Sequence, residues 1–308
     1  MSELQPNPDI KEPKKRIIDL LHMYVAGDSH EHTVFSNPKT RYEADYTFEQ
    51  VFNYINEEIN EGETAMQFVI LAEHPSDAGN PEMVDGQTLL EHQNQIQVFM
   101  ANQESQGKHL PRLISGVEAD IMSTGGKVNL PDEILQQMDF VIASKHGGLG
   151  EPNAGELESM YLGLMSNPNI DVIGHPNRYV QGDILGSMHW DELFSKARET
   201  NTAIEININA PMPDWLIKKA VGLGVPLFIG TDAHNLEQYQ NLPNEVRENI
   251  DQDKRLNYPL GVKYSFWKKM IRVLRSLEAA KCPPEQIITS SYERLIKWLT
   301  EEKSERKI

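Results

Sequence analysis

The stretch Val25-Ala26-Gly27-Asp28-Ser29-His30-Glu31-His32 carries a short apolar run into two histidines that stand two residues apart. Side chains alternate along an extended backbone, so His30 and His32 point to the same side of a strand. Two imidazoles on one side can bind one cation. We therefore interpret this stretch as a strand whose carboxyl end carries metal ligands.

Six further apolar runs also stop at residues that can bind a metal. They lead, in chain order, into Glu73-His74, Glu118, Lys145-His146, His175, Glu205 and Asp232-Ala233-His234. The carboxyl ends of parallel strands meet at one edge, where α/β barrels collect their active-site residues. The seven runs therefore predict one shared site.

Helical periodicity fills the intervals between these runs. Apolar residues spaced by three and four predict helices over residues 48–59, 88–102, 156–165, 191–200 and 214–223, and closing helices over residues 265–280 and 290–302. Thr47 is the expected cap of the first helix. The alternation of strands and helices predicts an α/β fold with a parallel core.

Composition and charge are typical of a globular enzyme. The chain has 308 residues, 39% of them hydrophobic, and a net charge of −17, which disfavours binding to nucleic acid or anionic membrane. Cys282 is the sole cysteine, so no disulfide forms within the chain. No signal peptide or membrane span is visible, and we expect a cytoplasmic protein. We expect a loose extension over residues 1–20 and a single catalytic domain over residues 21–308.

The histidines are better explained together than singly. One histidine after a strand is usually structural, but six of the ten lie at strand ends. We interpret His22, His92, His109 and His189 as structural. Histidine combined with carboxylate suits zinc, manganese or iron better than calcium or magnesium, and the sequence does not choose among the three.

The order of the motifs resembles the PHP (polymerase and histidinol phosphatase) family over about residues 20–300. The matching stretches are Asp28-Ser29-His30-Glu31-His32-Thr33, Ala72-Glu73-His74, Gly116-Val117-Glu118, Ala143-Ser144-Lys145-His146, Gly174-His175-Pro176 and Gly230-Thr231-Asp232-Ala233-His234. Asn129-Leu130-Pro131-Asp132-Glu133 is most similar to the branch of stand-alone bacterial PHP phosphatases and the PHP domains of family X DNA polymerases. The resemblance implies a distorted (β/α)7 barrel with a trinuclear metal site at the C-terminal ends of the strands.

The resemblance also implies a ligand set. The first metal would be held by His30, His32, Glu118 and Asp232. Glu118 would bridge to a second metal, completed by His146 and His175. A third metal would be held by His74 and His234.

This chain departs from the family pattern around the third metal. Asn37 and Pro38 stand where the family usually supplies a further Asp or His, and Glu73 replaces the usual aspartate before His74. The third site is therefore expected to be weaker, altered or filled by Glu73. We expect two to three divalent transition metals, as zinc, manganese or iron.

Several polar residues beside the ligands are candidates for phosphate binding or support. Arg178 follows His175 on the same loop and could bind two phosphate oxygens, the alternative being a surface ion pair. Lys145 is a weaker candidate for that role. We assign catalytic roles to Glu118, Asp232, His234 and Arg178. A further set, interpreted as support behind the ligands or barrel filling rather than as ligands, comprises Glu205, Asn207 and Asn209.

The leading hypothesis is a metal-dependent phosphoesterase that hydrolyses small phosphomonoesters with a metal-bridging hydroxide. Histidinol phosphate, sugar phosphates and nucleotides are all open as substrates. The alternatives are a phosphodiesterase or exonuclease acting on nucleic acid, which the lack of a basic stripe weakens, and a non-catalytic metal-stabilised partner module, which the large ligand set weakens. An amidohydrolase ranks low because a different ligand order or a catalytic lysine would be expected. The glycines of Gly125-Gly126-Lys127 do not form a P-loop, because its first glycine and its Ser/Thr are missing. The leaving group and the oligomeric state are not readable from the sequence.

Overall fold

The computed structural model describes residues 17–36, 44, 46–56, 66–75, 84–108, 111–146, 149–180, 182–234 and 264–302. The expectations for Asn37, Pro38 and His109 lie outside the described residues.

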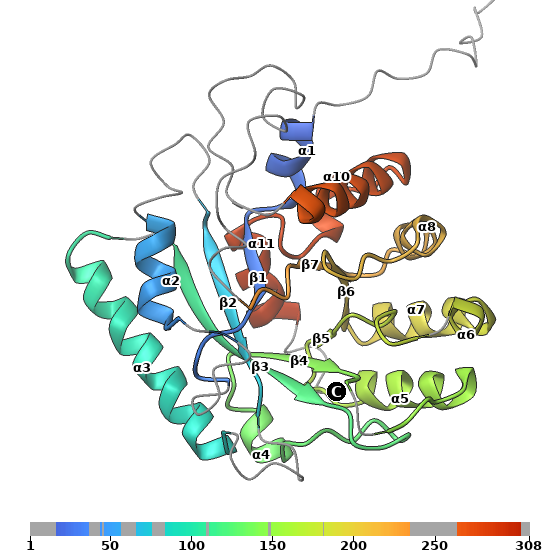
Figure 1. The fold of residues 1–308 in the computed structure, drawn as a ribbon, viewed down its shortest axis with the longest axis horizontal. Coiled ribbons are helices and arrows are strands. Elements are labelled where there is room, and N and C mark those ends of the chain that lie inside the picture. Colours follow the sequence, from blue (N-terminus) through green and yellow to red (C-terminus); the bar gives the residue numbers. More distant parts are fainter. Residues whose placement is uncertain are drawn as a thin grey trace, which may run out of the picture.

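Seven parallel strands form one sheet, ordered along the sheet as they are along the chain (Figure 1). They are β1 (Gly27–Glu31), β2 (Phe68–Glu73), β3 (Arg112–Asp120), β4 (Phe140–Ser144), β5 (Val172–Ile173), β6 (Ala203–Asn207) and β7 (Leu227–Gly230). Near their carboxyl ends, β1 and the segment after β7 meet through a parallel bridge between Glu31 and Ala233. The sheet thus curls into a nearly closed barrel, which confirms the (β/α)7 expectation.

The other end of the seam is closed by a segment from the end of the chain. The backbone of Ala26 donates to the carbonyl of Thr289 at 3.3 Å, and Ile288 donates to the carbonyl of Leu227 at 2.8 Å. Residues 287–289 therefore lie between the amino ends of β1 and β7.

Helices surround the sheet (Figure 1). They are α1 (Ile17–Tyr24), α2 (Phe48–Tyr54), α3 (Gly86–Ser105), α4 (Asp132–Leu135), α5 (Ala154–Met165), α6 (Gly182–Ser187), α7 (Trp190–Glu199), α8 (Asp214–Gly222), α10 (Tyr264–Ala279) and α11 (Tyr292–Lys297). Short turns η3 (Pro284–Gln286) and η4 (Trp298–Glu302) flank α11. Side-chain caps define several helix starts: Thr47 and Gln50 form a capping box before α2, as expected for Thr47.

Strand alternation divides the core into two layers. On β2, Phe68 and Ile70 belong to the cluster inside the barrel, whereas Val69 and Leu71 belong to the larger cluster under the helices. The inner cluster also contains Leu295 and Trp298, which are fully buried against the first residues of the strands. Helix α11 and the turn after it therefore fill the amino end of the barrel. The candidate ligands lie at the opposite, carboxyl end.

The expected loose extension over residues 1–20 is wrong in its last four residues. Helix α1 begins at Ile17, and Leu20 is fully buried in the main core. Burial of this apolar side chain fixes the last residues of the expected extension to the core. None of the helices in the described part of the chain is long and apolar enough to cross a membrane.

Candidate metal centre

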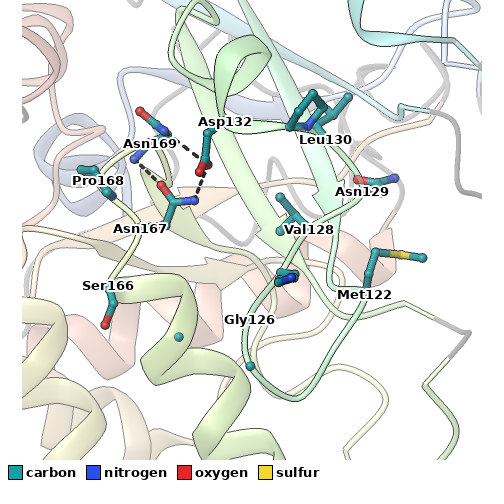
Figure 2. Close-up of a pocket in the computed structure, with 14 residues that line it drawn as sticks. Met122, Gly126, Val128, Asn129, Leu130, Asp132, Ser166, Asn167, Pro168 and Asn169 are labelled. Carbon is teal, nitrogen blue, oxygen red and sulfur yellow. Dashed lines mark hydrogen bonds between the residues drawn. The ribbon is translucent and has the colours of Figure 1, made fainter.

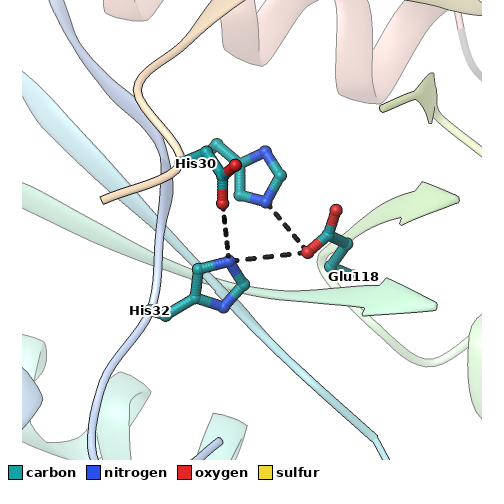
Figure 3. Close-up of side chains that lie close together, drawn as sticks. His30, His32 and Glu118 are labelled. Atoms are coloured by element: carbon teal, nitrogen blue, oxygen red, sulfur yellow. Dashed lines mark ion pairs between the residues drawn. The ribbon is translucent and has the colours of Figure 1, made fainter. Parts of the chain in front are cut away.

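Four buried side chains from three places in the chain converge at the carboxyl end of the barrel. They are His30 and His32 from β1 and the residue after it, Glu118 from β3, and Asp232 from the segment after β7. Each offers one ligand atom, and these atoms all lie within 4.8 Å of one another. Figure 3 shows both imidazoles turned toward the Glu118 carboxylate. The spacing of two residues in His30 and His32 places both rings on the same side, as the alternation of a strand requires.

Glu118 is the centre of a wider set of histidines. Its Oε2 lies 3.3 Å from Nε2 of His30 and 3.5 Å from Nε2 of both His32 and His74. Its Oε1 lies 2.9 Å from Nε2 of His175 and 3.5 Å from Nε2 of His146. A second group of candidate ligands, formed by His74, Glu118 and His146, therefore shares this carboxylate with the first group. A carboxylate with histidines on both oxygens is placed to bridge two cations.

The residues present fit a metal. Among the described residues, Nε2 of His30, Nε2 of His32 and Oε2 of Glu118 are buried and have no hydrogen-bond partner. A buried polar atom without a partner is costly, so three of them facing one point indicate a missing positive charge. Imidazole and carboxylate donors suit zinc, manganese or iron.

The protonation states of His32 and of the two carboxylates agree with ligation. Burial lowers the pKa of His30, but the charges of Glu118 and Glu205 outweigh it and raise that pKa well above its usual value, so this ring would lose a proton on binding a cation. Burial, together with the positive charge of His74, holds the pKa of His32 well below its usual value, so this ring is neutral. Burial opposes ionisation of Glu118, but the charges of His30 and His146 overcome it and hold the pKa of the carboxyl well below its usual range. Burial likewise opposes ionisation of Asp232, but the nearby rings of His234 and His32 more than offset it, so its pKa is also well below its usual range. Neutral imidazoles and ionised carboxylates are the forms that bind cations.

The centre is closed on one side and open on the other. His30, His32 and Glu118 are fully buried, whereas the side chains of His146 and His234 are 24% and 28% exposed. The ring of His32 stacks on that of His234 at 4.5 Å between centroids. Of the described ligands, His146 and His234 are therefore in contact with solvent.

Glu73 lies in neither group of candidate ligands. Its carboxylate accepts hydrogen bonds from the Thr33 hydroxyl at 2.6 Å and from the Ser36 hydroxyl. The Ser36 hydroxyl in turn accepts from the backbone of His74 at 3.0 Å. The structure thus places Glu73 as a brace between the turn after β1 and the end of β2. Its geometry gives no support to direct ligation.

Arg178 lies at the centre itself. Its guanidinium donates to Oδ2 of Asp232 and lies 5.1 Å from the ring centroid of Tyr179. Tyr179 is 59% exposed and has a φ of 60°, in the left-handed region that side chains other than glycine rarely adopt. Lys145 is almost fully buried, and its ammonium donates to the carbonyl of His146 at 3.3 Å. Arg178 is therefore the better placed of the two for contact with an incoming anion.

Asp120 is a functional candidate that the sequence analysis missed. Its carboxylate accepts a hydrogen bond from Nδ1 of His146, whose Nε2 faces Glu118. Carboxylates in this position orient metal-binding imidazoles. The signal was the alternation in Glu118-Ala119-Asp120, which places both acidic side chains on one face of β3.

A cavity of about 950 Å³ lies away from the metal centre, between the loop after β3 and the end of α5 (Figure 2). Gly125, Gly126 and Lys127 line it, but the loop turns back on itself through a bridge between Ile121 and Val128. A P-loop would run from a strand directly into a helix. None of the candidate ligands lines this cavity.

Parallel strands that deliver histidines and carboxylates to one end of a barrel define a class of metal-dependent hydrolases. No family model matches the chain. A probable phosphatase of Clostridium novyi is 31% identical over 179 residues, which cover 49% of this chain and 71% of that protein. The DNA polymerase/3'-5' exonuclease PolX of Bacillus subtilis is 36% identical over 139 residues, which cover 44% of this chain and 24% of the polymerase. The aligned part of the chain thus spans about a quarter of the polymerase.

The fold is shared with a solved phosphatase. The crystal structure of histidinol phosphate phosphatase from Lactococcus lactis, complexed with zinc, L-histidinol and phosphate, matches with a TM-score of 0.53 and 18% identity, over 82% of this chain and 92% of that one. The chain belongs to the PHP family of metal-dependent phosphoesterases. The expectation of an enzyme of the hydrolase class is confirmed.

Proposed function

We propose that this chain hydrolyses small phosphomonoesters at a centre of two to three divalent transition metals. The observation that carries the proposal is the convergence of five histidine Nε2 atoms on the two oxygens of one buried carboxylate, Glu118. Metals bound there would lower the pKa of a water and neutralise charge on phosphoryl oxygens.

The position of each residue suggests its role in metal binding, phosphate binding or proton transfer. Glu118 would hold two cations at a fixed separation, and Asp232 would complete the first set of ligands. Arg178 already contacts Asp232 from the open side, so a modest side-chain rotation would let its guanidinium bind a phosphate oxygen. His234 is part-exposed and its Nε2 lies 3.1 Å from Oδ1 of Asp232. With two metals bound it would exchange protons with the leaving group or the solvent, and with a third metal bound it would be a ligand.

The similarity to the Bacillus polymerase and exonuclease favours a second candidate, a nuclease. A nuclease must neutralise successive phosphates along a strand. Among the described residues near the centre, Arg178 pairs with Asp232 and Lys145 is almost fully buried. Lys269 is occupied by the carbonyl of Asn209, whose amide binds the carbonyls of Thr231 and Asp232. With a net charge of −17 on the whole chain, this supports a small monoester over a polymer.

The test is a substrate panel with metal analysis. The purified chain, loaded in turn with zinc, manganese and iron, would be given histidinol phosphate, sugar phosphates, nucleoside monophosphates and single-stranded DNA. We expect release of inorganic phosphate from at least one monoester and little degradation of DNA. Processive DNA degradation at physiological salt with no turnover of any monoester would transfer the assignment to the nuclease.

A further inference from the structure

One buried carboxylate, Glu205 on β6, contacts a candidate ligand of each of the first two metals. Its Oε1 lies 2.8 Å from Nδ1 of His30 and its Oε2 lies 2.5 Å from the backbone nitrogen of His175. The side-chain amide of Asn207 donates to Oε1 at 3.3 Å. Glu205 is fully buried and belongs to neither group of candidate ligands. It therefore lies behind the metal centre and not in it.

The contact with His30 has a direct consequence for the proton on its ring. Nε2 of His30 faces Glu118 and must offer a lone pair if it is to bind a cation. The ring proton must then reside on Nδ1, where the Glu205 carboxylate accepts it. A carboxylate accepts only, so it stabilises this tautomer and no other neutral one.

The contact with His175 fixes a strained piece of backbone. His175 has a φ of 23°, which is outside the regions that side chains normally allow. Its N–H donates to Glu205, and its ring then reaches Oε1 of Glu118 at 2.9 Å. Strain of this kind persists only where surrounding contacts hold it, and it is common at functional sites.

The neighbouring strand β7 has a glycine, Gly230, where it passes the Glu205 side chain. A Cβ placed on Gly230 of β7 would lie 2.4 Å from Oε1 of Glu205 and 2.8 Å from Cβ of His30. Any side chain at this position would separate the pair. The close approach of β7 thus keeps Glu205 against His30.

We propose that Glu205 is a positioning residue that couples the first two metal sites, fixing the tautomer of His30 with one oxygen and the backbone of His175 with the other. The inference rests on the metal centre of the proposed function. It assigns Glu205 no contact with the substrate.

Replacement Glu205→Gln tests this because it keeps the shape, reverses the hydrogen bond to His30 and removes the acceptor of the Asn207 amide. A glutamine amide has one accepting oxygen and one donating NH2 group. The backbone N–H of His175 can only donate, so it takes the amide oxygen. The NH2 group then faces Nδ1 of His30 and moves the ring proton to Nε2, the atom that should bind the metal.

The experiment compares zinc affinity in the wild type, Glu205→Gln and a matched control, Asp171→Asn, by competition with a fluorescent chelator. Asp171 is also a fully buried carboxylate, but it accepts from the backbone of Val141 at 2.9 Å near the amino ends of β4 and β5. We expect Glu205→Gln to weaken zinc binding by about 10–100-fold, the range for residues that orient metal ligands, and Asp171→Asn to leave zinc affinity unchanged. Wild-type zinc affinity in Glu205→Gln, or an equal loss in the control, would overturn the proposal.

A second measurement covers the case in which Glu205→Gln does not fold. In zinc-loaded wild-type protein, the ¹⁵N chemical shifts of the His30 ring should show Nε2 bound to metal and Nδ1 protonated. Metal on Nδ1 would overturn the proposal without any variant. Both readouts are independent of turnover, so failure of the phosphatase assignment in the substrate panel is distinguishable from failure of this inference.

Discussion

Replacement of His92 with phenylalanine should remove part of the acid sensitivity of the fold. His92 lies on the buried face of α3, stacked on Phe35 at 3.7 Å between ring centroids and edge-on to Phe48 at 5.5 Å. Its Nδ1 is buried and has no hydrogen-bond partner among the described residues. Burial lowers the pKa of His92 from 6.5 to about 4.

Acid lowers the free energy of unfolding because the unfolded chain binds the proton on His92 at a higher pH than the folded protein does. Below about pH 6.5 the unfolded chain protonates His92, whereas the folded protein does not until about pH 4, so falling pH favours unfolding throughout that window. With these pKa values, linkage gives a loss of about 2 kcal/mol between about pH 7.5 and about pH 5. His92→Phe keeps an aromatic ring between the two phenylalanines and cannot titrate. It should therefore lack this loss.

The assay is urea denaturation of wild type and His92→Phe at both pH values, at equal metal concentration. Other titrating groups are common to both proteins, so the difference between their pH dependences isolates His92. We expect the variant to be at least as stable as the wild type near neutral pH, because an unsatisfied polar atom is removed. Equal pH dependence in the two proteins would refute the argument that His92 is buried in its neutral form.

Two further predictions concern the metal centre. Glu118→Gln should abolish turnover and leave less than about one metal ion per chain, measured by elemental analysis, because it removes the charge that two cations would share; full metal content in this variant would contradict the bridging role. Arg178→Ala should lower kcat/KM for phosphomonoesters by a factor corresponding to about 1.5–3 kcal/mol, the range for a hydrogen bond to a charged group. Unchanged kinetics would assign Arg178 to structural pairing with Asp232.

The order of the fold could be read from the sequence because each apolar run is short and leads into a histidine or a carboxylate. The apolar run that leads into Glu118 is observed as β3, Arg112–Asp120, and the expected helix over residues 214–223 as α8, Asp214–Gly222. The insertion of residues 287–289 between β1 and β7 could not be read in this way. It depends on contacts between the two ends of the chain, and no local period records such contacts.

In the site, too, local patterns were predictable from the sequence and contacts between distant residues were not. The alternation of His30 and His32 was sufficient to place both imidazoles on one side. The position of Glu73 was not readable, because its neighbour His74 carries the ligand signal while Thr33 and Ser36 compete for the Glu73 carboxylate. Short polar side chains in a turn satisfy a buried carboxylate without any metal, and the sequence gives no sign of which partner it takes.

The net charge of the chain is negative, whereas the charge of the proposed metal-loaded centre would be positive. This difference favours a small substrate. The chain has a net charge of −17, so a phosphate dianion is repelled at a distance. Two divalent cations would carry about four positive charges against the two ionised ligands Glu118 and Asp232, and Arg178 would add about one more, so the local field would attract a phosphate. That reversal is confined to roughly the 10 Å over which charges act at moderate salt. A small monoester fits inside such a region, whereas a nucleic acid strand would extend beyond it over an acidic surface, and its binding would be correspondingly weak.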